Sequence, residues 1–240
     1  MASITRPPHR PTGASLAALI GVGTAFAGVA VLHVVRADLD PRQAVMSHYA
    51  NGSAGPVMSI VFYAFGAAAL TVAIRLWTAI DRHGATRAFP PLMATAGVLM
   101  LLAGVFEVDR PDAPQTFGEV VHSNSAVAGF VLLVVSMALC TWACGRDERW
   151  RSFRRRSAVL TAVAAVAAVG AKVSTGTSWT GAVQRVLAGA VLLWLLLAAR
   201  HVRRRHFAAL ATDVAVDELG DGDGADVLVH IPPARPGGAS

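Results

Sequence analysis

Six side chains of this sequence have the types that recognise a polar ligand, and they lie in or next to polar segments between long apolar runs. Imidazole, carboxylate, amide and guanidinium groups donate and accept hydrogen bonds, and imidazole also exchanges protons near neutral pH. We predict that the six form one polar pocket, and their spacing assigns none of them a catalytic role. The candidate binding residues are His48, Tyr49, Asp109, His122, Gln184 and Arg185.

The segment GVFEVDRPDAPQTFGEVVH, residues 104–122, carries most of the candidate acids and one of the histidines. Thr116 and Glu119 have the T-x-x-E spacing of a capping box, which predicts that a helix begins there. His122 follows Glu119 by three positions, so both lie on one face of that helix. Polar groups inside a membrane helix face a bundle interior or a cavity, which makes His122 a candidate pocket residue.

A second polar segment, DPRQAVMSHYANG, precedes the next apolar run. Asp40 before Pro41 is typical of a helix start, and Gln43 completes the spacing of a capping box. We therefore predict a short helix over residues 41–50 that lies on the membrane interface and carries His48 and Tyr49.

Two cations, Lys172 and Arg185, lie near the ends of apolar runs. A charge inside a span costs about 2.5–3.5 kcal/mol at the bilayer centre and less near its edge. Lys172 is expected to extend to the interface. For Arg185 we predict an inward ion pair, with Asp109 as first partner and Glu107 as second, and with His122 beside them.

The elements that position these residues are helices that span a membrane. The chain is 54% hydrophobic and 15% charged, with a mean hydropathy of +0.52, and its apolar residues occur in runs of about the 20 residues that a bilayer requires. The fold class is an all-α integral membrane protein with six transmembrane helices. We expect a segment at 1–12, a membrane domain at 13–206 and a disordered tail at 207–240, with helices at about 13–35, 56–78, 89–107, 120–144, 157–173 and 180–199.

The basic residues indicate how these helices are oriented. Fifteen arginines lie in the two terminal segments and in the connections on the same side of the membrane, whereas the connections on the other side hold five basic residues. This bias predicts a protein of the cell membrane with both termini in the cytoplasm. Arginine clusters at helix ends serve topology, so membrane lipids are the expected partners and nucleic acid is excluded. Cys140 and Cys144, one turn apart, are expected to be packing residues.

Several functions remain open for the predicted outer pocket. Its ligand is expected to be a lipid headgroup, a quinone or a small solute, and no cofactor is assigned. One alternative is a metal-dependent lipid hydrolase with His33, His48, His122 and Asp109 as ligands. A second is a haem b redox protein with His33 and His122 as axial ligands, and a third is a transporter.

Three motifs in this order resemble a prokaryotic six-helix membrane family, domain of unknown function 998. They are SHYANG with Ser47, Tyr49 and Gly52, then GVFEVD…H with Gly104, Phe106, Asp109 and His122, then GAVQR with Gly181, Gln184 and Arg185. One departure is Phe106–Glu107 in place of the family's Phe-Pro. The resemblance, over residues 13–200, implies the six-helix fold and a site on the outer face, and it implies no activity.

Overall fold

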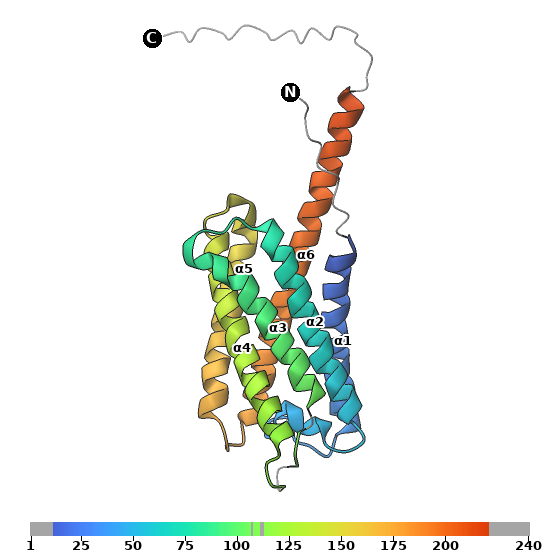
Figure 1. The fold of residues 1–240 in the computed structure, drawn as a ribbon, viewed down its shortest axis with the longest axis vertical. Helices are drawn as coiled ribbons and strands as arrows, with labels where there is room; N and C mark the ends of the chain where they lie inside the picture. Colours follow the sequence, from blue (N-terminus) through green and yellow to red (C-terminus); the bar gives the residue numbers. More distant parts are fainter. Residues whose placement is uncertain (1–11, 107, 111–112, 221–240) are drawn as a thin grey trace, which may run out of the picture. The chain divides into compact units, whose positions relative to one another are not determined.

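The computed structural model describes residues 12–106, 108–110 and 113–220, with the backbone alone for Thr12, Ala14 and residues 206–220. All regular structure in these ranges is helical (Figure 1). The long helices are α1 (Thr12–Val35), α2 (Gly55–Ala79), α3 (Phe89–Val105), α4 (Phe117–Cys144), α5 (Arg151–Val173) and α6 (Thr180–Gly220), and the short 3₁₀ helices are η1 (Met46–Ala50), η2 (Gly84–Ala88) and η3 (Glu148–Trp150). Residues 1–204 and 205–240 form separate units, and the packing described below is that of the first.

Six helices in the described ranges are long and apolar enough to cross a membrane, as predicted. Inside a bilayer each backbone N–H and C=O needs an internal partner, which a helix supplies to nearly all of them. The first five helices pack in chain order, and α6 contacts α1 through Arg185 and α5 through Trp194. Cys140 and Cys144 are free and buried in this packing, in agreement with their predicted structural role.

The connections between helices gather at two ends of the bundle (Figure 1). We call the end with residues 36–54, 108–110, 113–116 and 174–179 the acidic end, and the end with residues 80–88 and 145–150 the arginine-rich end. At the acidic end the connections touch one another, since the Asn51 side-chain amide donates to the Asp109 carbonyl at 3.5 Å. The predicted candidate residues therefore share one end of the molecule.

The predicted helix over residues 41–50 is wrong in its length. The carbonyl of Asp40 accepts from the amides of Gln43 and Ala44, which makes a single turn, and only η1 follows. In a continuous helix the Met46 amide would donate to the Arg42 carbonyl. Here both groups form hydrogen bonds with α6 instead. Met46 N donates to Gln184 Oε1 at 3.1 Å, and the Arg42 carbonyl accepts from Ala182 N at 3.0 Å.

The start of α4 at Thr116 agrees with the prediction, although its cap is built differently. Thr116 Oγ1 accepts from the Glu119 amide at 3.3 Å, as a capping box requires. The Thr116 amide, however, donates to Asp109 Oδ2 at 2.6 Å rather than to Glu119. Glu119 instead accepts from the Asp109 amide and from Ser123 Oγ. Asp109 is therefore a structural capping group of α4.

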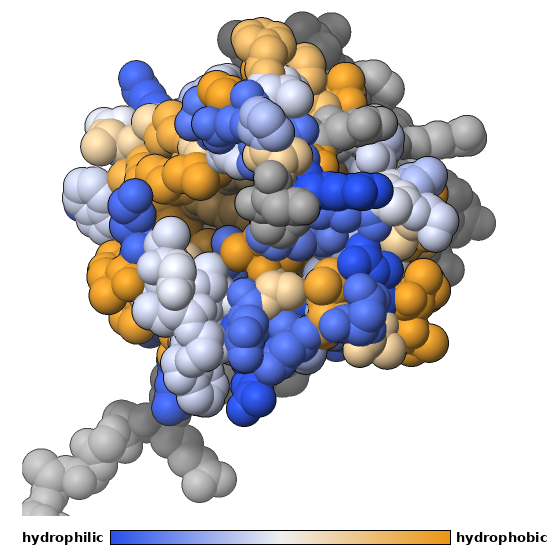
Figure 2. Space-filling model, turned by 90° about the horizontal axis from the view of Figure 1, so that it is seen from below, coloured by the Kyte–Doolittle hydropathy of each residue, from blue (hydrophilic) through white to orange (hydrophobic). Residues whose placement is uncertain are grey.

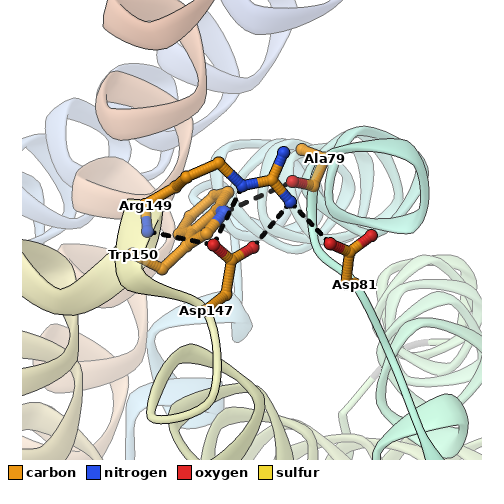
Figure 3. Close-up of polar contacts among 5 residues, drawn as sticks. All are labelled: Ala79, Asp81, Asp147, Arg149 and Trp150. Atoms are coloured by element: carbon orange, nitrogen blue, oxygen red, sulfur yellow. Dashed lines mark hydrogen bonds and ion pairs between the residues drawn. The ribbon is translucent and has the colours of Figure 1, made fainter.

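The arginine-rich end is closed by contacts between two connections (Figure 3). Arg149 bonds to Asp147 through its amide, Nε and Nη2, and its Nη2 also reaches Asp81 at 2.7 Å. The fully buried Trp150 donates from Nε1 to the Ala79 carbonyl at 3.2 Å. The connection after α4 is thus fixed to the end of α2.

The predicted boundary at 206 lies close to the division between the two units, which falls after residue 204. Helix α6 continues to Gly220, so residues 207–220 are helical rather than disordered. Residues 221–240 of the predicted tail lie outside the described residues, as do residues 1–11 of the predicted segment 1–12.

Candidate functional site

The side chain of Arg185 is the centre of one polar cluster at the acidic end. Its Nε donates to His33 Nε2 at 2.9 Å, and its Nη1 donates to the carbonyls of Ala44 and Gly181, each at 2.9 Å. Its guanidinium carbon lies 5.1 Å from the ring centroid of the buried Tyr49. The Arg185 side chain thereby joins α6 to α1 and to the 36–54 connection.

The predicted ion pair between Arg185 and Asp109 is wrong. Asp109 accepts from the amide and hydroxyl of Thr116, and the hydrogen bonds of Arg185 go to neutral acceptors. Glu107, the second predicted partner, lies outside the described residues. The Nη2 atom of Arg185 is buried and has no hydrogen-bond partner among the described residues.

A close approach of backbone explains how α6 brings Arg185 and Gln184 to the 36–54 connection. A Cβ on Gly181 would meet the carbonyl oxygens of Pro41 and Ala44, so only glycine lets the two segments touch there. A cavity of about 10 Å³ lies beside Arg185, His33 and Tyr49. This is room for roughly one water molecule.

A much larger cavity, of about 780 Å³, opens at the same end between α2, α3 and α4. Figure 2 shows this face of the molecule with polar residues surrounding a recess that has a hydrophobic wall. The apolar lining comes mainly from the spans and the polar lining from their ends and the connections. The lining includes Met58, Ile60, Phe62, Tyr63 and Phe106, and, among polar residues, Asn51, Ser59, Asp109, Arg110 and His122.

His122 is placed in this cavity by the first turns of α4. The residue is 3% exposed, its Nδ1 lies 2.7 Å from the Ala103 carbonyl, and the Phe62 ring meets its ring edge-on with centroids 5.1 Å apart. A Cβ on Gly104 would lie 2.7 Å from Tyr63 Cε1, so this glycine allows the Tyr63 ring to lie against α3. These two contacts shape the wall of the cavity.

His48 lies in η1, close enough to the α4 start to feel the charge of Glu119. Burial lowers the pKa of His48 below its ordinary value of 6.5, and the negative charge of Glu119 partly opposes that shift. At neutral pH the His48 ring is therefore neutral. It does not line either cavity.

The structure thus places five of the six predicted residues in two groups. Tyr49, Gln184 and Arg185 belong to the α1–α6 cluster, whereas Asp109 and His122 line the large cavity, and His48 lies apart. The sequence analysis named His33 only as a possible metal or haem ligand, and it did not consider two cavity residues of α2, Ser59 and Tyr63. A signal existed for the last two, because positions 59 and 63 are one turn apart and place polar atoms on one face of an apolar helix.

Two of the alternative functions, the metal-dependent hydrolase and the haem protein, require several ligands close together, and the described residues do not provide such a set. No three His, Cys, Asp or Glu side chains there form a group that could hold a metal ion. His33 lines the small cavity and His122 the large one, so the two predicted axial ligands do not face one haem-sized space.

Six spanning helices with this arrangement define a multi-pass integral membrane protein. The chain belongs to the family described as "Protein of unknown function (DUF998)", whose profile matches residues 19–201. This confirms the resemblance drawn from the three sequence motifs. Comparisons with curated proteins and with solved structures found no match.

Proposed function

We propose that the protein binds a lipid or a lipid-like amphiphile in the large cavity at the acidic end. The observation that carries this proposal is the cavity itself, with about 780 Å³ of space and a lining divided into apolar and polar parts. Ligand sites of membrane and soluble proteins have volumes of about 300–1,000 Å³ and mostly apolar walls with a few polar groups.

The cavity is reachable from the hydrocarbon region. Ile60 and Tyr63 line it, and they are 50% and 40% exposed on the spanning helix α2. In our proposal these two exposed side chains lie where the cavity meets the surrounding lipid. The acyl chain of an amphiphile would contact these two residues, while its headgroup would lie among the polar residues of the connections.

Purification with endogenous lipid, followed by mass spectrometry of the bound fraction, tests this proposal. Ser59→Phe fills the cavity from α2 and is expected to abolish the enrichment of any lipid species. Ile74→Phe adds the same ring on the same helix at a position that is 64% exposed and away from the cavity, and it should leave the enrichment unchanged. Equal lipid content in wild type and Ser59→Phe contradicts the proposal.

The cavity faces the outside of the cell in our proposal, with both termini in the cytoplasm. The support is the excess of arginine in the connections at the opposite end. A cysteine introduced at the exposed Thr177 should react with an impermeant thiol reagent added to intact cells, and one at the exposed Ser152 should not. The reverse pattern would place the cavity on the cytoplasmic face.

A further inference from the structure

Resting on the proposed function, we infer that the ligand carries a hydroxyl-bearing headgroup, and that His122 Nε2 accepts a hydrogen bond from it. The ligand class is then an amphiphile with one or more free hydroxyls, of which a monoacylglycerol is an example.

The contact with Ala103 determines which nitrogen of His122 carries the proton. The Ala103 carbonyl only accepts hydrogen bonds, so Nδ1, at 2.7 Å, must be the donor. In the neutral ring, Nε2 is then an acceptor.

The Nε2 atom has room for a partner. No described residue donates a hydrogen bond to it, and it is not among the fully buried polar atoms that lack a partner, so it reaches open space. Because His122 lines the large cavity, that space is the cavity. A ligand group that meets this atom favourably must be a hydrogen-bond donor.

Two hydroxyls of α2 line the same cavity. Ser59 and Tyr63 make no side-chain hydrogen bond with the described residues, and their spacing of four places them on one face of the helix. A hydroxyl donates one hydrogen bond and accepts others, so these groups can pair with further ligand hydroxyls. The carboxylate of Asp109, which also lines the cavity, already accepts one hydrogen bond at each oxygen from Thr116.

The inference is tested with two probes that share the acyl chain and the glycerol oxygens: 1-oleoylglycerol and its dimethyl ether, in which methyl groups replace the two hydroxyl hydrogens. Tritiated 1-oleoylglycerol is bound to the purified full-length protein in nanodiscs, and the ether is used as an unlabelled competitor. One hydrogen bond to a buried acceptor corresponds to about a tenfold preference. The wild type should therefore bind 1-oleoylglycerol about ten times more tightly than the ether.

Two variants of His122 separate ligand recognition from structural support. His122→Asn keeps a donor near the place of Nδ1, so it preserves the Ala103 contact and removes the Nε2 acceptor. His122→Gln keeps an acceptor near the place of Nε2 and loses the Ala103 contact. We expect His122→Asn to fold and to lose the preference for the free hydroxyls, and His122→Gln to unfold at lower temperature while keeping that preference.

The outcomes distinguish this inference from the function on which it rests. Equal affinity of the wild type for both probes overturns the inference and leaves amphiphile binding in place. Failure of 1-oleoylglycerol to bind also overturns it, and together with equal lipid content in Ser59→Phe it removes the proposed function as well. Loss of the preference in His122→Gln but not in His122→Asn would show that His122 only supports the helix packing.

Discussion

Arginines at the two ends of the bundle are stabilised in opposite ways. At the arginine-rich end, Arg149 is 52% exposed in its side chain and bonds to two carboxylates, Asp147 and Asp81 (Figure 3). At the acidic end, Arg185 is half-buried and bonds to an imidazole and two carbonyls, with its Nη2 unpartnered among the described residues. The carboxylate of Asp109 at that same end caps α4 instead.

This difference indicates different roles for the two ends. At the arginine-rich end, the charge of Arg149 is paired with the carboxylates of Asp147 and Asp81, and these ion pairs join two connections. At the acidic end the acids are used by backbone amides and hydroxyls, which leaves neutral polar atoms such as His122 Nε2 to face the large cavity. In our proposal the acidic end receives a polar group that donates hydrogen bonds.

Removal of the Arg185 side chain should have the largest effect on stability. Arg185→Ala leaves the Ala44 carbonyl and His33 Nε2 without their donor, which costs about 3 kcal/mol for a charged donor with several acceptors. Arg185→Lys should recover part of that loss, since one ammonium reaches fewer of the acceptors. Thermal unfolding in detergent measures both.

Coupling energies then identify the true partner of Arg185. His33→Ala combined with Arg185→Ala should be non-additive by about 1 kcal/mol, whereas Asp109→Ala combined with Arg185→Ala should add within about 0.5 kcal/mol. Strong coupling to Asp109 would restore the ion pair that the sequence suggested and remove the contrast between the two ends.

At the arginine-rich end, the two partners of Arg149 should differ in importance. Asp147 is 7% exposed in its side chain and accepts three hydrogen bonds from Arg149, whereas Asp81 is 75% exposed and accepts one. Asp147→Ala should destabilise the protein by about 2 kcal/mol and Asp81→Ala by less than about 0.5 kcal/mol. Chemical unfolding of the two single variants decides this, and equal losses would show that the pair acts as one unit.

Loss of the Asp109 carboxylate should have a smaller effect, confined to the start of α4. Asp109→Ala removes the acceptor of the Thr116 amide and hydroxyl, and the loss of a helix cap costs about 1 kcal/mol. Asp109→Asn keeps one acceptor oxygen and should lose about half as much. Faster hydrogen exchange in residues 117–121, without change in α2, is the expected signature, and a global acceleration would contradict a local cap.

The helices could be predicted from sequence because a bilayer leaves an apolar run of this length no other structure. The start of α4 was equally accessible, since Thr116 and Glu119 are close in the chain. The partners of Arg185 were not, because charge and depth alone favoured an acid. That argument overlooked backbone acceptors: Arg185 reaches the Ala44 carbonyl only because Gly181 admits the 36–54 connection against α6. The same tertiary contact shortened the predicted helix at Met46.

The smallest expected effect concerns pH and the acidic end. Burial lowers the pKa of His48 below its ordinary value of 6.5, with Glu119 opposing the shift. As the pH falls through 6.5, the unfolded chain therefore binds a proton at this position before the folded protein does. By linkage, the stabilisation present above pH 6.5 decreases as the pH is lowered.

Wild type should lose more thermal stability between pH 7.5 and about pH 5 than His48→Gln, which cannot titrate, with Asp81→Ala as the matched control from the opposite end. If His48→Gln loses as much stability as wild type over this range, His48 is not the group responsible for the pH dependence. The two ends of the bundle would then not differ in pH dependence through His48.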